Sequence, residues 1–486
     1  MTSRRDFLTT GIAGLGFLPL AVQQAWAGDA PTAGGSGAAS AGPAAAPPVK
    51  TIREAARDVP VVEDVDVLIA GAGPAGIGAA LAAAAGGAKV RLIEVHGCLG
   101  GVWTAGLLTW LFHMNQPGIG SRLTRELERR GARIGKSLVN YTYDVEAMKV
   151  MLEDLCGEAK VGVRLFTRVV AAGRDEKNRL TTVVTESKSG REAWRAKVFI
   201  DATGDGDLAA RAGCGFDLGE AGTGLTQPMT FMALMLVPRA EDVKEHISFY
   251  QGTGQHTTCK EATLKAFAKT GFEPSYGRPT IFQVRGNLLA LMINHEYGVS
   301  AIDARQVTEA TVRARAEVQK AAAALRAFGG PWAGVQLVAT PEQIGVREGR
   351  RIHGRYRVTL DDLKAGAQHA DAVCRVTFNV DIHSLRGGED RGLSHGGVKV
   401  KPYDIPLRAL IAKDVDGLLM AGRCASGDFY AHASYRISGP SVSMGQAAGA
   451  LAALSAASGR LPHDVPFEDV RKALEALNTA AEPAKA

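Results

Sequence analysis

A strand that runs into a glycine-rich turn constrains the fold of this chain more than any other feature. Apolar residues 67–70 lead into a Gly-x-Gly-x-x-Gly turn formed by Gly71, Gly73 and Gly76. Small residues at Ile77–Ala85 predict a helix, and a second apolar run ends on Glu94. Such glycines let backbone N–H groups approach a pyrophosphate, and an acid about 20 residues further on binds a ribose. The pattern predicts a βαβ unit that binds a dinucleotide; the alternative is an incidental glycine-rich turn.

The N-terminal residues predict export. Ser3-Arg4-Arg5-Asp6-Phe7-Leu8 is a twin-arginine pattern, followed by an uncharged apolar stretch from Leu8 to Val22 and a small-x-small sequence at 25–27. The stretch is short and broken by glycines and Pro19, which suits a signal peptide better than a membrane span. We therefore expect residues 1–27 to engage the twin-arginine export machinery and the protein to be periplasmic or otherwise exported. Retention as an uncleaved anchor is the alternative.

Composition limits the class of protein. A chain of 486 residues with 46% hydrophobic content can bury a large core, as two domains or as one domain with a large insertion. The net charge of +6 is spread without a long basic run, so no nucleic-acid partner is indicated. The six cysteines are scattered, with no Cys-x-x-Cys and no histidines at metal spacing. We expect mostly buried thiols and no metal site.

Changes in composition predict the domain boundaries. Residues 28–60 begin with a stretch of Ala, Gly, Pro and Ser that cannot bury enough surface to order itself, so they form a flexible linker. A nucleotide-binding domain is expected over 61–214 and 341–478. Met-rich β-like runs and Ala-rich helices between them, over 215–340, indicate an inserted substrate or cap domain. Residues 479–486 are expected to be a disordered tail.

Periodicity predicts several elements within these domains. Helices are expected at Asp144–Glu158 and Gln306–Phe328, and a helix of small residues from Pro440 to Ala457. Three short alternating segments predict a small antiparallel meander beside the parallel strands. These segments are Val161–Phe166, Val169–Gly173 and Thr181–Glu186.

Several separated motifs, in a fixed order, carry a resemblance to a known family. Besides the Gly71–Gly76 turn with Glu94, they are Gly100-Gly101, Ala202-Thr203-Gly204-Asp205-Gly206-Asp207, Tyr403-Asp404-Ile405-Pro406, Leu418–Arg423 and His432–Gly449. Together they resemble a family of FAD-dependent oxidoreductases within the glutathione-reductase-like flavoprotein superfamily. The resemblance implies an α/β fold: an FAD-binding Rossmann domain, with a parallel sheet plus an antiparallel meander, and an inserted α+β cap.

The resemblance implies FAD as the cofactor. It also implies that the helix from Pro440 points its N-terminus at the flavin, where the helix dipole stabilises negative charge. The implied FAD contacts are Gly71, Gly73, Pro74, Ala75, Gly76, Glu94, Gly100, Gly101, Ala202, Thr203, Gly204, Asp205, Gly422, Arg423 and Gly445.

Some of these assignments have simpler alternatives. Arg423 could instead be a surface arginine, and Asp205 and Asp207 could cap the following helix rather than bind FAD. Gly445 and Gly449, one helical turn apart, could serve close helix packing alone. A covalent flavin link through His96 or Cys98 stays open, because only their position in the sequence suggests it.

Three residues are candidates for catalysis. Histidine suits proton transfer because its ordinary pKa lies near neutrality, and His432 matches a family histidine close to the flavin. His383 shares a strand face with Asp381, as a carboxylate–imidazole pair requires. Arg436 could anchor an anionic substrate, balance reduced flavin, or form a structural salt bridge. A structural role is the alternative for both histidines.

Two further groups allow more than one interpretation. The charged stretch of Arg347, Glu348, Arg350 and Arg351 is typical of a solvated helix face, although the family often keeps a Glu/Arg pair that would bridge cap and core. An apolar stripe in the central insert suggests the wall of a pocket, but stripes of this kind are more typical of a hydrophobic core. Its members are Met229, Phe231, Met232 and Met235.

These observations predict an exported FAD-dependent oxidoreductase. It would oxidise a small organic substrate by hydride transfer to flavin N5 and pass electrons to oxygen or a respiratory carrier. The central insert holds no second Gly-x-Gly-x-x-Gly after a strand, so stable NAD(P)H binding is not expected. The alternative is a flavin-dependent lyase or isomerase without net redox turnover. Substrate and oligomeric state stay open.

Overall fold

The computed structural model describes residues 51–254, 256–388, 391–394 and 396–481. The chain divides into two units, 1–57 and 58–486, and residues 51–57 form no helix or strand. The predicted signal peptide, the first part of the linker and most of the tail lie outside the described residues. The second unit begins its regular structure with β1 (Val61–Ala70).

A five-stranded parallel sheet brings the sequence motifs to one edge. Its order is β6 (Gly162–Arg164), β2 (Val90–Ile93), β1, β9 (Gly190–Asp201) and β22 (Leu418–Met420). Ala70, the last residue of β1, pairs with Ile93 and with Asp201. Since carboxyl ends of parallel strands share an edge, the turn at Gly71, Glu94 and the segment from Ala202 are neighbours.

An antiparallel meander extends the same sheet. It consists of β7 (Arg168–Arg174), β8 (Leu180–Ser187) and the first half of β9, with Val183 opposite Trp194. The prediction was wrong for Val161–Phe166, because β6 pairs in parallel with β2 instead. The chain reaches β6 through the helix α3 (Val145–Glu158), and such a helical crossover lets β6 pair in parallel with β2. Asp144 caps α3 by accepting hydrogen bonds from Glu146 N and Ala147 N, as expected for a helix beginning there.

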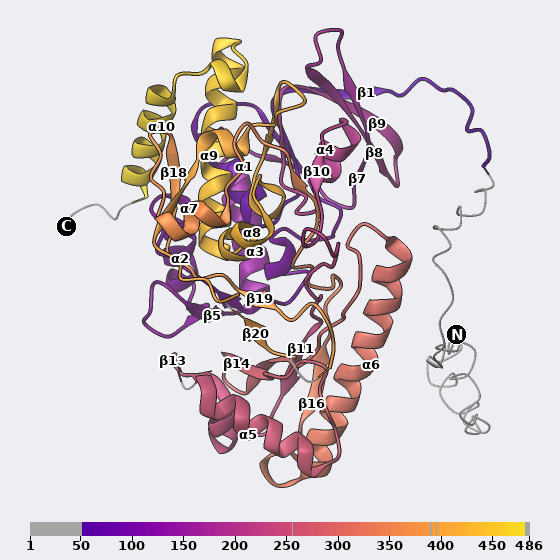
Figure 1. Ribbon diagram of the computed structural model, residues 1–486, viewed down its shortest axis with the longest axis vertical. Helices are drawn as coiled ribbons and strands as arrows, with labels where there is room; N and C mark the ends of the chain where they lie inside the picture. Colours follow the sequence, from indigo (N-terminus) through magenta and orange to yellow (C-terminus); the bar gives the residue numbers. More distant parts are fainter. Residues whose placement is uncertain (1–50, 255, 389–390, 395, 482–486) are drawn as a thin grey trace, which may run out of the picture. The chain divides into compact units, whose positions relative to one another are not determined.

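Two helices of small residues pack closely in front of the sheet. They are α1 (Pro74–Ala85) and α9 (Ser438–Ser458), which lie side by side in Figure 1. A side chain at Gly445 would collide with the backbone oxygen of Ala75, and one at Gly449 with that of Ala79. α9 begins two residues before Pro440, which stands in its first turn where a missing N–H costs nothing.

The central part of the chain forms a second sheet. Its order is β13 (Thr253–Gly254), β12 (Ile247–Tyr250), β14 (Thr280–Arg285), β15 (Leu288–Met292), β11 (Met232–Leu236) and β16 (Gln336–Ala339). α5 (His256–Lys269) and α6 (Ala304–Phe328) lie beside it in Figure 1, and Asp303 caps α6.

The stripe of methionines belongs to the core. Met229, Phe231 and Met235 pack with apolar residues of α6 in one hydrophobic cluster, while Met232 joins the cluster that contains α1 and α9. Trp110 stacks on Phe249 with ring centroids 3.5 Å apart and so connects the second sheet to the first part of the chain. The core interpretation of the stripe is therefore the one that the structure supports.

Shorter elements complete the described part. The helices are α2 (Ile119–Arg129), α4 (Asp207–Arg211), α7 (Leu360–Ala365), α8 (Phe429–Tyr435) and α10 (Phe467–Ala480). The strands are β3 (Trp110–Leu111), β4 (Arg133–Ile134), β5 (Tyr141–Tyr143), β10 (Phe216–Asp217), β17 (Arg351–Ile352), β18 (Ala372–Val376), β19 (Ile382–His383), β20 (Leu393–Ser394) and β21 (Tyr403–Pro406).

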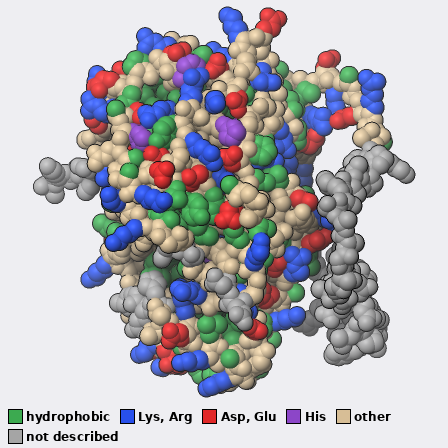
Figure 2. All heavy atoms as spheres, in the orientation of Figure 1, with side chains coloured by type: hydrophobic (Ala, Val, Ile, Leu, Met, Phe, Trp, Pro, Cys, Tyr) green, Lys and Arg blue, Asp and Glu red, His purple; other side chains and the backbone are tan. Residues whose placement is uncertain are grey.

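All six cysteines are buried, as expected of structural thiols. Among the helices of the described residues, none combines the length and the apolar character needed to cross a bilayer. Acidic and basic side chains are intermingled over the face drawn in Figure 2.

Candidate functional site

The three glycines of the first turn have different structural reasons. Gly71 has φ +95°, and a Cβ there would collide with the backbone of Ala202. A Cβ on Gly76 would collide with the carbonyl oxygen of Gly71. A Cβ on Gly73 would meet no atom within 4 Å. The protein itself therefore requires the first and third glycines, while the space beside Gly73, at the N-terminus of α1, is free for a ligand's phosphates.

Glu94 is buried directly beyond β2 and faces the glycine turn. Its carboxylate accepts hydrogen bonds from Ala72 N at 2.6 Å and from His96 N at 2.9 Å. Val95 follows Glu94 in the chain, and Phe166 N donates a hydrogen bond to His96 O; the two residues are 39% and 66% exposed. An acid for a ribose and two exposed apolar side chains that could contact an adenine thus lie together. The sequence alone did not single out Val95 or Phe166.

The paired glycines come back to the first turn. Gly100 N donates to Ala72 O at 2.8 Å, and a Cβ on Gly101 would approach within 3.0 Å of the Gly73 Cα. In the same loop, burial raises the pKa of the Cys98 thiol. His96 Nδ1 lies 3.2 Å from Glu342 Oε1. Of the two candidates for a covalent link, Cys98 is thus held in its less reactive thiol form.

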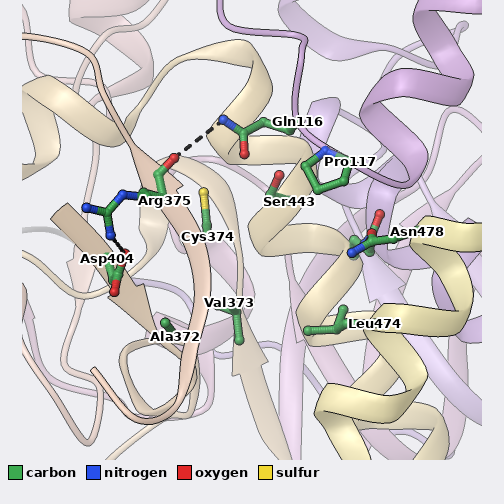
Figure 3. Close-up of a pocket in the computed structure, with 11 residues that line it drawn as sticks. Gln116, Pro117, Ala372, Val373, Cys374, Arg375, Asp404, Ser443, Leu474 and Asn478 are labelled. Carbon is green, nitrogen blue, oxygen red and sulfur yellow. Dashed lines mark hydrogen bonds and ion pairs between the residues drawn. The ribbon is translucent and has the colours of Figure 1, made fainter. Parts of the chain in front are cut away.

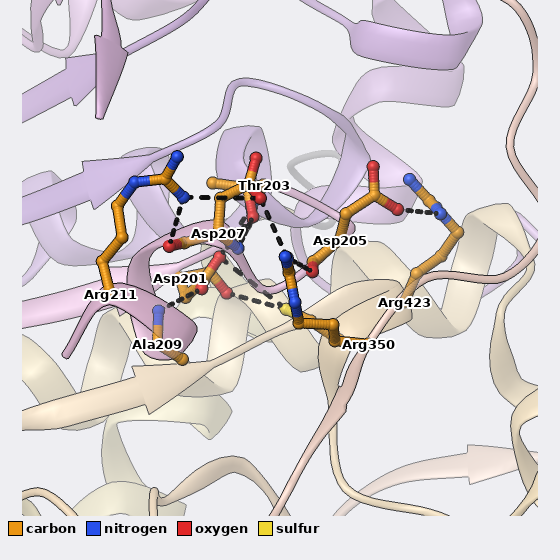
Figure 4. Close-up of polar contacts among 9 residues, drawn as sticks. Asp201, Thr203, Asp205, Asp207, Ala209, Arg211, Arg350 and Arg423 are labelled. Carbon is orange, nitrogen blue, oxygen red and sulfur yellow. Dashed lines mark hydrogen bonds and ion pairs between the residues drawn. The ribbon is translucent and has the colours of Figure 1, made fainter. Parts of the chain in front are cut away.

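The segment Ala202–Asp207 is organised by carboxylates (Figure 4). Asp201 accepts hydrogen bonds from Thr203 and from Ala209 N, so it fixes the turn and the start of α4. Asp205 pairs with Arg423 at 2.9 Å. Burial raises the pKa of Asp205 and the Arg423 guanidinium opposes that rise. Asp207 bonds Arg350 at 3.0 Å.

Arg423 is not a free surface side chain, because it contacts the Ala202–Asp207 segment. Its guanidinium lies so close to Gly204, which has φ +82°, that a Cβ at that position would collide with it. Gly422, with φ +81°, lies against the side chain of Ala75. Gly445 is likewise placed against Ala75, so its lack of a side chain is explained by packing of α9 on α1 rather than by a space for a ligand.

The catalytic candidates meet around one glutamine. Arg436 Nη2 donates to Gln227 Oε1 at 3.0 Å, and the backbone N–H of His383 donates to the same oxygen at 3.1 Å. Arg436 also bonds the backbone oxygen of Asp381 at 2.7 Å and lies 3.4 Å from its carboxylate. His432 stands one helical turn before Arg436, on α8. The structure thus joins two of the three predicted residues, Arg436 and His383, through Gln227, which sequence reasoning missed, and His432 is linked to Arg436 along the helix.

His432 is a buried imidazole that packs edge-on against the ring of Tyr435. Within the described residues neither of its ring nitrogens has a hydrogen bond, although the Arg423 backbone lies near the ring. Gln227 Nε2 and Arg436 Nε are buried and unpartnered in the same way. Burial and the charges of Arg351 and Arg436 hold the pKa of His432 well below its usual range, so the ring is neutral.

A pair of histidines extends the site toward the second sheet. His383 Nε2 lies 3.6 Å from Asp381 Oδ2, which agrees with their predicted shared strand face. His383 Nδ1 lies 3.0 Å from His295 Nε2, and His295 Nδ1 lies 3.1 Å from the Tyr297 hydroxyl. Burial and Arg347 lower the pKa of His383 to about 3. His295 follows β15 and was missed; a polar Asn-His-Glu sequence directly after an apolar strand is the signal that could have found it.

The charged stretch 347–351 is not a solvated helix face. Glu348 and Arg351 are both buried and pair with one another. Glu348 also accepts a hydrogen bond from Gln227 N at 3.1 Å. Arg351 donates to the carbonyls of Gly219 and Gly427. The pair bridges segments that are far apart in the sequence, and the solvated interpretation is wrong because these side chains have buried partners.

A separate hollow of about 260 Å³ lies between α9, α10 and β18 (Figure 3). None of the residues of the glycine turn or of the histidine cluster lines it. Its polar groups are largely bonded to one another: Gln446 accepts from Ile119 N and donates to Asn478. The hollow is distinct from the candidate site.

The residues present fit a flavin dinucleotide. The free space at Gly73, the carboxylate of Glu94 and the nitrogens of His432, Gln227 and Arg436 could receive phosphates, a sugar and a polar ring. The model of the FAD dependent oxidoreductase family matches residues 66–474. The chain belongs to this family; it is an FAD-dependent oxidoreductase with a Rossmann-type α/β fold.

Comparison with solved structures finds distant flavoproteins. A geranylgeranyl bacteriochlorophyll reductase-like protein of Thermoplasma acidophilum is 13% identical, over 86% of this chain and 83% of that chain, with a TM-score of 0.41. A p-nitrophenol 4-monooxygenase of Pseudomonas putida is 11% identical, over 86% and 89%, with a TM-score of 0.44. A flavin-dependent monooxygenase in complex with FAD and substrate is 15% identical, over 61% and 52%, with a TM-score of 0.40. No curated protein matches the sequence.

Proposed function

We propose that this chain is an exported FAD-dependent oxidoreductase of the glutathione-reductase-like superfamily that oxidises a small organic substrate. FAD, when bound, supplies a hydride acceptor at flavin N5, from which oxygen or a respiratory carrier takes the electrons. Residues of the glycine turn, Glu94, the paired glycines and the Asp205–Arg423 pair would hold it. The second sheet with α5 and α6, over residues 215–340, would form the substrate or cap domain.

One observation carries the proposal: a fully buried, neutral His432, whose ring nitrogens have no side-chain partner among the described residues, one helical turn before Arg436. Buried polar atoms are rarely left unpaired, so a ligand group is expected to face them. A neutral imidazole can accept the substrate proton during oxidation. Arg436, held by Asp381 and Gln227, would position the substrate, and the Asp381–His383 pair would hold the adjoining wall.

Anaerobic reduction of the purified, FAD-loaded protein tests this function. Alcohols, hydroxy acids, amines and amino acids are added in turn while the visible flavin band is recorded. With an effective donor the band bleaches, and His432→Asn slows bleaching about 100-fold because the proton acceptor is lost. His463→Asn, which changes a partly exposed histidine, serves as the matched control and should bleach at the normal rate.

Failure of every donor class to bleach the band would contradict the oxidoreductase proposal. Turnover of a substrate with no electron acceptor present would instead favour a lyase or isomerase. Export is proposed from the twin-arginine pattern alone, and fractionation of cells that make the full chain tests it: the protein is expected outside the cytoplasm.

A further inference from the structure

Arg347 is a partly buried guanidinium whose hydrogen-bond partners among the described residues are neutral. Its Nη1 donates to the carbonyl of Pro228 at 2.6 Å and to the hydroxyl of Thr230 at 2.7 Å. In the described part of the chain, no carboxylate lies within 4 Å of it, and its Nε and Nη2 make no hydrogen bond. A guanidinium in a partly buried site is ordinarily matched by a carboxylate or phosphate, so the free N–H groups of Arg347 can bind an anion.

Charge in this cluster is not balanced by the protein. Three guanidinium groups, those of Arg347, Arg351 and Arg436, face two carboxylates, those of Asp381 and Glu348. Glu348 is taken by Arg351, and Asp381 is shared between Arg436 and His383. The buried histidines are neutral and add no further positive charge. Of these three guanidinium groups, Arg347 is the one without a paired carboxylate, and its charge acts on both histidines of the pair.

A neutral donor stands close to that charge. The ring of Tyr276 lies 4.1 Å from that of His295, centroid to centroid. Burial raises the pKa of Tyr276 to about 12 while Arg347 lowers it, so the hydroxyl keeps its proton near the guanidinium. In the described residues this hydroxyl makes no hydrogen bond. A carboxylate accepts hydrogen bonds from donors of these two kinds, a hydroxyl and a guanidinium with free N–H groups.

We propose that Arg347, Tyr276 and Arg436 bind a carboxylate of the substrate, so that the substrates of this enzyme are small organic acids. This inference rests on the proposed function and narrows it. The carboxylate supplies the missing negative charge, and the histidine pair next to it contacts the rest of the molecule. An oxyanion could also come from the FAD diphosphate, and the experiment below separates these two sources.

Binding of simple acids to the FAD-loaded protein tests the inference without turnover. Propionate and succinate are titrated by calorimetry, with propionamide as a neutral molecule of similar shape. The acids are expected to bind and propionamide is not. Arg347→Met should weaken acid binding about 100-fold, since a partly buried charged partner of the carboxylate is lost. Arg285→Met removes the same charge from an exposed side chain of β14 and should leave acid binding within about twofold.

The following outcomes test whether Arg347 binds a substrate carboxylate. Acids that fail to bind, or bind equally to the Arg347→Met protein, overturn the inference. A loss of FAD affinity in Arg347→Met with unchanged acid binding overturns it too, because the anion held is then the diphosphate. Should Arg347→Met not fold, Arg347→Lys keeps the charge but loses the planar fork, and about tenfold weaker acid binding is expected. If only neutral donors bleach the flavin band, the proposed function stands, but the inference that the substrate is an organic acid is refuted.

Discussion

At the scale of single residues, the three glycines of the first turn are glycine for different structural reasons. Gly71 and Gly76 are fixed by the protein's own backbone, because a side chain at either position collides with it. Gly73 is not, since its φ of −68° suits any residue and nothing stands near a Cβ there. Its lack of a side chain therefore serves the ligand, as the close approach of a pyrophosphate requires.

Gly73→Ala should accordingly separate cofactor binding from stability. The apoprotein is expected to unfold within about 1 kcal/mol of the unmodified chain, whereas FAD affinity should fall at least about tenfold because a methyl group occupies the phosphate space. Flavin content and urea unfolding measure the two effects. Gly157→Ala, in α3 with an equally open Cβ position, is the control and should keep its FAD. Normal FAD affinity in Gly73→Ala would refute this account of the turn.

At the scale of elements, the contact between α1 and α9 positions the site. Gly445 and Gly449 let the backbone of α9 touch Ala75 and Ala79 of α1, so the helix N-terminus near His432 is held relative to the glycine turn. The sequence offered two interpretations for these glycines, approach to the cofactor or helix packing. The coordinates support packing, because the atoms that fill the space are backbone atoms of α1.

Gly445→Ala should therefore destabilise the protein even without FAD. A methyl group forced between two helices costs about 1–3 kcal/mol, which a lower urea midpoint of the apoprotein would report. Gly157→Ala is again the control, and there a helical Gly-to-Ala change is expected to stabilise by about 0.5–1 kcal/mol. An apoprotein of unchanged stability combined with weakened FAD binding would instead assign Gly445 to the cofactor.

At the scale of the whole molecule, one buried ion pair joins distant segments around the site. Glu348 holds Arg351 and the backbone of Gln227, while Arg351 reaches the carbonyls of Gly219 and Gly427. Gln227 in turn contacts Arg436 and His383. The pair thus holds the segment at Gln227, which precedes the second sheet, in place relative to α8, which carries His432.

Removing one partner of this pair should be costly. Glu348→Ala leaves Arg351 buried without its carboxylate and is expected to lower the free energy of unfolding by about 3–5 kcal/mol. Urea unfolding of the FAD-loaded protein measures it. Arg285→Gln breaks the exposed pair with Asp144 and should cost less than about 1 kcal/mol. Similar losses in the two variants would show that the buried pair does not hold the molecule together.

Local patterns in the sequence determined the nucleotide-binding unit, the long helices and the Asp381–His383 pair. Each depends on neighbours within one strand, turn or helix, where spacing alone sets which side chains share a face. Gln227, His295 and Arg347 could not be assigned this way, because their roles depend on partners dozens of residues away. Tertiary structure decided that a charged stretch is buried, that β6 joins the parallel sheet and that Gly445 serves packing. Burial and long-range contact are properties of the folded chain, and no local pattern contains them.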